Sequence, residues 1–322
     1  DKLTVTVEAG IRLETLVETL AEDGLELCGG YELQGRTVGG AVAAPCFGPS
    51  IGRSGSFFSS HVVAMKIVTA SGKMLTIDKS QKNLLAAFRQ SFGLLGVIYE
   101  VTLQVRPIRT FTASHRRVSV DKFASMVDTL AASDVGLKFY LMPYRDRVYL
   151  DLRRYDAGPG NAYQAPWRLK DWGESTVLPH VFKSLNRIVP IQSVKYRLID
   201  SISEATQGLV NSRLVHSGSN AASQSQRRSS KRKTFYSSWC FPAADFSVVA
   251  VAYKEFCESV LQHSQYRCDL PAVGYRLSHD PSSPLSPSFD ETMIVLTTAA
   301  TQLKGWDDFV IDLADFAEQW GG

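Results

Sequence analysis

The sequence lacks several features that would assign it to a common class of protein. No apolar run approaches the ~18 residues that a membrane-spanning helix requires. The formal net charge is only +3, which is too small to argue for a nucleic-acid partner. No N-x-S/T sequence for N-glycosylation is present and no internal repeat is visible, so nothing in the sequence points to secretion or to a repeat fold.

Cysteine is scarce, and its spacing indicates no metal or disulfide framework. The five cysteines are odd in number and none forms a C-x-x-C pair; they are Cys28, Cys46, Cys240, Cys257 and Cys268. This pattern favours reduced thiols in a cytosolic-type compartment over a disulfide scaffold or a zinc site. We therefore predict a cytoplasmic protein without a metal site.

What is present is typical of a globular protein with two domains. The chain has 322 residues, of which 44% are hydrophobic and 21% are charged. The residue pattern changes after Arg106-Pro107, where a long alternating segment ends. We predict an α+β fold with one domain at residues 1–107 and a second at 108–322, the latter an antiparallel sheet flanked by helices.

Hydrophobic periodicity predicts the elements of both domains. In the first domain we expect strands at 3–7, 62–70, 74–77 and 97–105 and helices at 13–20 and 83–90. In the second domain we expect strands at 118–120, 136–143, 147–153, 234–241, 268–277 and 291–298 and helices at 122–132, 244–262 and 305–320. Residues 155–172, rich in Gly, Pro and aromatic side chains, are expected to be irregular.

Two basic stretches allow two interpretations each. An apolar helical stripe from Val181 to Val189 is flanked by Lys183, Arg187, Lys195 and Arg197. It is consistent with docking to a membrane surface, or with an ordinary core-facing helix, which is the commoner case. Residues 217–233 end in a run of arginine and lysine, which is consistent with an anionic partner or with a mobile, solvated loop.

A glycine-rich stretch near the start of the chain is the most informative part of the sequence. Thr37-Val38-Gly39-Gly40 is followed by small residues and by a second loop that contains Gly48, Ser50, Gly52, Ser54 and Gly55. Such loops bring the main chain close to a ligand, and free N–H groups in them form sites for anions or polar ring edges. A Gly-Gly pair alone is more often a plain turn.

The blocks around this stretch raise its specificity. In chain order they are Val7-Glu8-Ala9-Gly10, Gly24-Leu25, Thr37-Val38-Gly39-Gly40, His61-Val62, Val68-Thr69-Ala70-Ser71-Gly72 and Gly93-Leu94-Leu95-Gly96-Val97-Ile98. The series resembles the second half of the flavin domain of the vanillyl-alcohol oxidase superfamily (PCMH-type FAD-binding proteins). Members include aldonolactone, alditol and decaprenylphosphoryl-ribose oxidases and cytokinin dehydrogenase. The resemblance covers residues 1–107.

The resemblance implies an FAD site and its residues. The main chain of Thr37, Val38, Gly39 and Gly40 would border the cofactor. The loop from Ala44 to Gly48, with Cys46 and Phe47, would run beneath the isoalloxazine, and Ile98 would meet the adenine with its main chain. Many relatives carry a histidine, often bonded to the flavin, at the place of Phe47. We therefore predict noncovalent FAD, with Cys46 a packed thiol rather than a covalent anchor and His61 a structural residue.

A second motif lies in the second domain. Gly274-Tyr275-Arg276-Leu277, Asp280 and Leu285-Ser286-Pro287 resemble the Glu-x-Arg…Asp…Leu-Ser-Pro segment of aldonolactone and alditol oxidases. The resemblance implies that Arg276 stabilises negative charge on the reduced flavin, although a surface salt bridge is the default for a lone arginine. Gly274 replaces the glutamate, which puts polyol or sugar-lactone recognition in doubt. His279 is a candidate base.

The functional expectation is a FAD-dependent oxidoreductase. It would oxidise a small hydroxylated substrate such as a sugar or lactone by hydride transfer to flavin N5, with O₂ or another acceptor. The alternatives are a flavin-dependent alkene reductase of the same fold and a non-enzymatic binding module without flavin. Relatives carry an Arg-Gly-x-Gly-type pyrophosphate loop before this segment and a further C-terminal segment. We therefore expect the chain to be a piece of a longer protein, cut at both ends.

Overall fold

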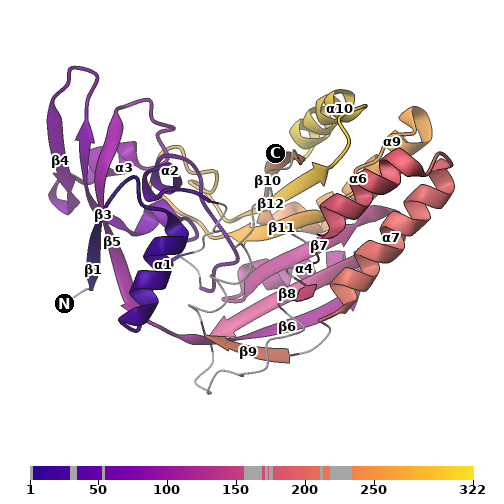
Figure 1. Ribbon diagram of the computed structural model, residues 1–322, viewed down its shortest axis with the longest axis horizontal. Coiled ribbons are helices and arrows are strands. Elements are labelled where there is room, and N and C mark those ends of the chain that lie inside the picture. The colour runs from indigo at the N-terminus through magenta and orange to yellow at the C-terminus, as the bar shows by residue number, and fades with distance from the viewer. Residues whose placement is uncertain are drawn as a thin grey trace.

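The computed structural model describes residues 3–29, 35–52, 55–155, 169–170, 173, 177–210, 213–217 and 234–322. Two antiparallel sheets dominate the described part of the chain, one in each half (Figure 1). The predicted α+β architecture with two sheets is therefore confirmed. The first sheet ends with the strand that closes at Pro107, and the second sheet begins at Thr110.

The first sheet runs in the order β1-β5-β3-β4, with β2 paired to the end of β5. Three helices pack their apolar residues against it in one common core. The strands are β1 (Thr4–Glu8), β2 (Leu25–Leu27), β3 (Val62–Val68), β4 (Met74–Asp78) and β5 (Val97–Pro107), and the helices are α1 (Leu13–Glu22), α2 (Val38–Ala43) and α3 (Lys82–Phe88).

The second sheet has seven strands in the order β10-β12-β11-β7-β8-β6-β9. Every pair in it is antiparallel. The strands are β6 (Thr110–Val118), β7 (Gly136–Met142), β8 (Arg147–Tyr155), β9 (Arg213–Ser217), β10 (Phe235–Pro242), β11 (Ala272–Leu277) and β12 (Met293–Ala300).

One face of the second sheet is covered by α4 (Val120–Ala132), α9 (Phe246–Ser264) and α10 (Trp306–Gln319). Its core includes tilted aromatic rings, with Phe139 lying 4.7 Å from Phe123 and 5.7 Å from Phe246 between ring centres. We call this side the helix-covered face. Since side chains alternate along a strand, every second residue points to the opposite side, which we call the second face.

Two further helices, α6 (Leu178–Ile188) and α7 (Gln192–Gly208), form a hairpin with a small core of its own. Figure 1 shows this hairpin at the end of the molecule that is remote from α1, α2 and α3. The residues of α7 that approach the sheet meet the second face near Arg117 and Tyr149. The second face thus has the first domain at one end and α7 at the other.

Several expectations about local structure were wrong. The stretch after Thr37 is the short helix α2 rather than a loop, because Thr37 caps it by accepting the Gly40 N–H at 3.2 Å. A strand was expected only at 118–120, but β6 occupies Thr110–Val118 and Val120 already begins α4. The elements β2, α7 and β9 were not expected. Nearly all of 155–172 and 217–233 lies outside the described residues.

Other expectations concern composition and membrane contact. All five cysteines are free, as their spacing predicted. No helix in the described ranges is long and apolar enough to cross a membrane. Within the same ranges, no group of three or more His, Cys, Asp or Glu side chains is placed to hold a metal ion.

Candidate active site

A loop of the first domain packs directly on the second face. Phe47 and Phe57 form an isolated β-bridge in this loop, and Phe57 is fully buried. The Phe47 ring stands edge-on to the Phe57 ring and to the Tyr275 ring, each at 6.1 Å between centres. Together with Leu277 and Val295 these rings make one apolar cluster. The predicted flavin loop therefore touches the second sheet at Tyr275.

Tyr275 belongs to a line of residues that crosses six strands of the second face. Each member is the direct cross-strand partner of the next. We call the line the central row, and its members are Cys240, Val295, Tyr275, Lys138, Asp151 and His115. The half of the row under the first-domain loop is mainly apolar and runs from Cys240 to Tyr275. The other half consists of the charged or ionisable side chains of Lys138, Asp151 and His115.

Asp151 is the electrostatic centre of this half. It is 2% exposed, and Arg153 on the same strand holds both of its carboxylate oxygens at 2.7–3.2 Å. The His115 Nε2 atom lies 4.0 Å from the same carboxylate. Burial alone would raise the pKa of Asp151, but the charge of Arg153, helped by His115 and Lys170, lowers it well below its usual range. Asp151 is therefore ionised and fixed.

Two lysines enclose an aromatic residue beside Asp151. The Lys138 ammonium lies 5.0 Å from the centre of the Tyr140 ring and 5.2 Å from that of Tyr275, and the buried Lys170 lies 4.6 Å from Tyr140. Cations over aromatic faces are attracted by the ring quadrupole, which fixes the lysine side chains. Among the described residues, Lys138, Lys170 and Arg153 surround the single carboxylate of Asp151, so their charges make this part of the second face positive.

The central row lies between two boundaries. Toward the first domain, Gly136 lies beside Ser50 and Ile51, where a Cβ on Gly136 would come within 3.1 Å of both. Toward α7, a groove of about 410 Å³ runs between Arg117 and Tyr149 of the sheet and Glu204 of the helix. The row is thus framed by the predicted flavin loop on one side and by α7 on the other.

The start of α2 was expected to offer free main-chain N–H groups to a ligand, and the structure differs from this expectation. The Val38 N–H donates to Ile11 O at 2.9 Å and the Gly39 N–H to Ala9 O at 2.8 Å, so these donors are used within the domain. Free N–H groups for an anion are therefore not available at Val38 and Gly39. The glycines instead permit close packing, since a Cβ on Gly39 would lie 2.8 Å from the Ala9 Cβ. Gly40 is exposed.

The remaining predicted cofactor residues lie at different depths. Cys46 is buried in the core of the first domain, and its carbonyl accepts the Phe58 N–H at 2.8 Å. Ala44 and Phe47 are half-buried, whereas Gly48 is buried. Ile98 is half-buried on β5 and packs against the first core. Their contacts with a cofactor stay predictions, as do those of the α2 segment.

His61 has the structural role expected of it. Its ring fills the space beside Gly29 and Gly55, where a Cβ on either glycine would come within 2.7 Å of it. Its Nε2 atom is 3.1 Å from Gly55 O. Burial lowers the pKa of His61, so the neutral ring is favoured.

Arg276 lies on the helix-covered face and not on the second face. It is 1% exposed, and its guanidinium donates to Ser133 O at the end of α4 and to Gly52 O in the first domain. It therefore ties the end of a helix to the first-domain loop. The predicted role at the flavin finds no support in this placement and stays a prediction.

Two neighbours of Arg276 complete the comparison with the motif. Gly274 also faces the helices, where a Cβ would lie 2.0 Å from Cζ of Phe139, so the ring of Phe139 occupies the place of a larger side chain. His279 is exposed beyond the end of β11, and its N–H lies 3.3 Å from the Thr292 hydroxyl. His279 is not part of the central row, and its role as a base stays a prediction.

Sequence reasoning missed the residues of the central row and its neighbours. A signal was present, because Asp151 is the lone acid of its strand and stands between Leu150 and Leu152. Lys138 is likewise a charged residue between Leu137 and Phe139. A charge that interrupts an apolar run is costly to bury unless it is paired, and so it marks a specific environment.

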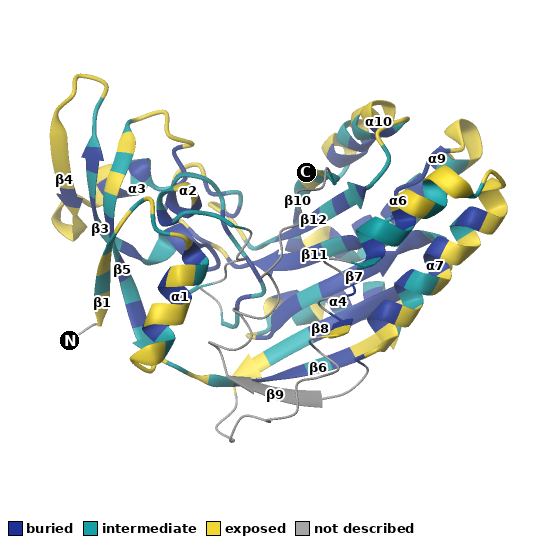
Figure 2. Ribbon diagram, viewed as in Figure 1, coloured by how far each residue is buried: buried dark blue, intermediate teal, exposed yellow. Residues whose placement is uncertain are grey.

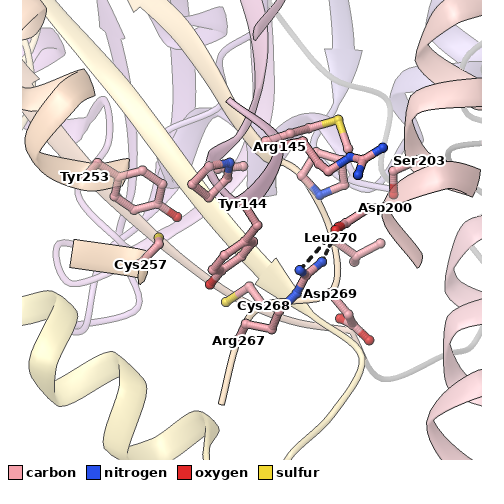
Figure 3. A pocket seen from close by; sticks show the side chains of 14 residues that line it. Tyr144, Arg145, Asp200, Ser203, Tyr253, Cys257, Arg267, Cys268, Asp269 and Leu270 are labelled. Atoms are coloured by element: carbon pink, nitrogen blue, oxygen red, sulfur yellow. Dashed lines mark hydrogen bonds and ion pairs between the residues drawn. The ribbon is translucent and has the colours of Figure 1, made fainter. Parts of the chain in front are cut away.

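A separate cavity is too small to be the site. It holds about 20 Å³, room for a water molecule, and lies among Tyr144, Cys257, Cys268 and the ion pair of Arg267 with Asp200 (Figure 3). The Arg267 guanidinium stacks over the Tyr144 ring at 4.2 Å, and burial raises the pKa of Cys257 to about 12. These groups form a packed, inert cluster.

The chain is similar to known proteins in sequence. Residues 1–78 match the FAD binding domain family. An L-gulono-1,4-lactone dehydrogenase of Mycobacterium tuberculosis is 31% identical over 144 residues, which are 45% of this chain and 33% of that protein. A D-arabinono-1,4-lactone oxidase of Yarrowia lipolytica is 27% identical over 222 residues, which are 64% of this chain and 41% of that protein. The chain therefore spans between a third and two fifths of these relatives.

Solved structures with the same fold cover nearly the whole chain. The cholesterol oxidase from B. sterolicum has a TM-score of 0.73 at 13% identity, covering 96% of this chain and 66% of that chain. The berberine bridge enzyme from Eschscholzia californica has a TM-score of 0.56 at 16% identity, covering 98% and 61%. The FAD binding domain match at residues 1–78, the similarity to lactone dehydrogenases and oxidases and this shared fold together support the resemblance to FAD-linked oxidases of the vanillyl-alcohol oxidase type.

Proposed function

We propose that the protein is a FAD-dependent oxidoreductase that oxidises a small hydroxylated compound of the sugar-lactone type. The observation that carries the proposal is the contact of Phe47 with Tyr275. It sets the loop expected beneath the isoalloxazine against Tyr275, the member of the central row that is the cross-strand partner of Lys138. An oxidoreductase of this fold needs such an arrangement, with a cofactor on one side and polar groups on the other.

The residues present suit the ring end of FAD. Gly40 is exposed, and a Cβ there would meet nothing nearer than the Thr37 hydroxyl at 3.3 Å, so the main chain leaves space beside it. Phe47 is half-buried and carries no group that bonds to a flavin, which supports noncovalent attachment. The segment from Thr37 to Gly48 would hold the cofactor by main-chain and van der Waals contacts.

When bound, FAD supplies the redox chemistry, accepting the equivalent of a hydride from a substrate C–H bond. The protein supplies position and charge. Lys138, held over two tyrosine rings, offers a cation to substrate oxygen or to negative charge that develops during oxidation. Asp151, held by Arg153, keeps the cation cluster in place and balances part of its charge.

The proposed substrate class rests on the names of the relatives and on one residue, Gly274, that differs from the motif of the lactone oxidases. The relatives are lactone dehydrogenases and oxidases by name, which supports a hydroxylated lactone or sugar as substrate. Gly274 replaces the glutamate of their motif, and its space is filled by Phe139. Substrate hydroxyls would therefore be bound by the positive central row, and selectivity would differ from that of the relatives.

A spectral experiment tests the proposal on the full-length protein. After incubation with FAD and removal of excess cofactor, absorbance near ~450 nm is expected, and it should bleach when an aldonolactone is added without oxygen. No retained absorbance would favour a binding module without flavin. Retained absorbance that only NAD(P)H bleaches would favour an alkene reductase of the same fold.

Acid precipitation tests the mode of attachment separately. The yellow colour should stay in solution when the protein is precipitated, because no histidine stands at the position of Phe47. Colour in the pellet would show a covalent bond. Repetition with Cys46→Ser would then decide whether the thiol of Cys46 is the anchor.

A further inference from the structure

The tip of the α6–α7 hairpin exposes apolar side chains to solvent. Ile188 ends α6 and is 74% exposed, and Ile191 directly precedes α7 and is 61% exposed. Val194 and Leu198, about one and two turns further along α7, are also exposed. We call these four residues the hairpin tip. Positions 191, 194 and 198 lie on one side of a helix, so the exposed apolar groups form one surface.

The hairpin does not need these residues for its own packing. Its small core contains Leu178, Phe182 and Ile199, with Tyr196 and Ile202 packed against them. The apolar stripe seen in the sequence is therefore divided, with its first part in this core and its end at the hairpin tip. A contiguous exposed apolar surface on a folded domain marks a site of interaction.

The exposed charged side chains that α6 and α7 carry near the hairpin tip are of one sign. Lys183, Arg187 and Arg197 are exposed beside it. Residues 175–199 contain no aspartate or glutamate. The first acids that follow, Asp200 and Glu204, are bonded to Arg267 and Arg145. Among the described residues Asp269 lies beside α6, where it accepts from Asn186 and Thr301, but the exposed charged side chains of the hairpin near its tip are cations.

The position of the hairpin tip leaves the candidate active site free. Figure 2 shows the exposed surface of α6 and α7 at the edge of the molecule that is remote from α1, α2 and α3. The central row lies on the sheet between these two parts. A large partner bound at the hairpin tip would therefore not cover the first-domain loop at Phe47.

We propose that the hairpin tip docks onto the surface of an anionic lipid membrane. Apolar side chains flanked by arginine and lysine are the composition of elements that lie in the headgroup region, where the cations meet anionic lipids. A second copy of the chain is a poorer occupant, because symmetric contact would bring two basic tips together. The helices are placed to lie on the bilayer, with Ile188 and Ile191 entering its boundary.

Vesicle co-sedimentation tests the proposal with the full-length protein. Vesicles of phosphatidylcholine alone are compared with vesicles in which about a third of the lipid is phosphatidylglycerol. The protein should bind the anionic vesicles and bind more weakly as salt is raised, because salt screens surface charge. A protein that does not bind the anionic vesicles, or binds both kinds equally, would overturn the proposal.

Two matched variants locate the binding surface. Arg187→Gln with Ile191→Ser removes one cation and one apolar side chain at the hairpin tip. Lys304→Gln with Leu303→Ser removes the same kinds of group at another exposed place, before α10. One cation near an anionic surface contributes about a 5-fold gain in binding, so the tip variant should bind at least about tenfold more weakly. The control should bind as the unaltered protein does.

All altered residues are exposed, so the fold should survive, and far-UV circular dichroism with the thermal midpoint checks this. If the tip variant binds vesicles as tightly as the control, the hairpin tip is not the docking surface. A third outcome is that neither protein binds vesicles, but the unaltered protein is a dimer and the tip variant is a monomer. The hairpin tip would then join two copies of the chain, and the proposal would be wrong.

Discussion

Lys138 and Tyr275 lie directly opposite each other on neighbouring strands, with the Lys138 ammonium 5.2 Å from the centre of the Tyr275 ring. The other side of Tyr275 meets Phe47 of the first domain. One tyrosine therefore connects the expected cofactor loop with the nearest cation of the second sheet. This pair places Lys138 as the residue of the central row best positioned to act on a bound substrate.

Replacing Lys138 should reduce turnover more than stability. In Lys138→Met the apolar stem is kept and the cation is lost, so kcat/KM with an aldonolactone should fall roughly 100-fold, the effect of removing one electrostatic contact to developing charge. Steady-state kinetics on the FAD-loaded protein measures this. Lys254→Met, which removes a cation paired with Asp146 on the helix-covered side, is the control and should leave kcat/KM unchanged. Equal loss in both variants would contradict the assignment.

Asp151→Asn should destabilise the protein strongly. The substitution leaves the half-buried Arg153 without its carboxylate, and breaking a buried ion pair from one side costs about 3–5 kcal/mol in the free energy of unfolding. Denaturant unfolding of both proteins at neutral pH gives the difference. Glu204→Gln, which breaks the more exposed pair with Arg145, should cost less than about 1 kcal/mol.

The ion pair of Asp151 with Arg153 also predicts how the free energy of unfolding depends on pH. The folded pKa of Asp151 lies below its unfolded value of about 4, so its contribution is complete above that value and is lost as the pH falls toward the folded pKa. The unaltered protein should therefore lose stability below pH ~4 more steeply than Asp151→Asn does. Parallel acid limbs in the two proteins would show that the carboxylate of Asp151 does not carry this effect.

The sequence predicted those helices and strands that are determined by the hydrophobic pattern of their own residues. The short apolar run from Gly136 to Met142 and the long apolar face from Phe246 to Val260 were sufficient, because nearly all of the first and one side of the second are buried. The helix at Val38 was missed because glycine has low helix propensity. The Thr37 cap, main-chain bonds to the residues after β1 and packing in the first core stabilise it. Propensity alone gives no information on such contacts.

The site was harder to predict because it depends on register between distant strands. Arg276 was assigned to the flavin from the likeness of its neighbours, but one-residue alternation decides the face, and Tyr275 is the residue that faces Phe47. Likewise, Lys138 and Asp151 become neighbours only when β7 pairs with β8. A single sequence does not contain that register.

Arg276→Met should separate a structural role from a catalytic one. The guanidinium donates to Ser133 O and Gly52 O, so its loss removes two charge-assisted hydrogen bonds. The free energy of unfolding should fall by about 2–3 kcal/mol, although Gly52 O keeps the Ser278 hydroxyl as a donor. Denaturant unfolding measures this, and Arg276→Lys should recover part of it. Unchanged stability with lost turnover would instead favour the role at the flavin that the motif implies.

Gly274 and Phe139 should be coupled, because each occupies the space that the other leaves. Gly274→Ala places a Cβ where the Phe139 ring lies, and overpacking of a core costs about 1–3 kcal/mol. Phe139→Leu alone should also destabilise, since it leaves a cavity among Phe123 and Phe246. In the double variant the shorter leucine makes room for the added methyl group, so the loss should be smaller than the sum of the two single losses by about 0.5–3 kcal/mol.

Denaturant unfolding of the four proteins gives this coupling energy. Strict additivity would mean that the ring of Phe139 moves aside freely, and a glutamate at position 274, as in the lactone oxidase motif, would then be tolerated.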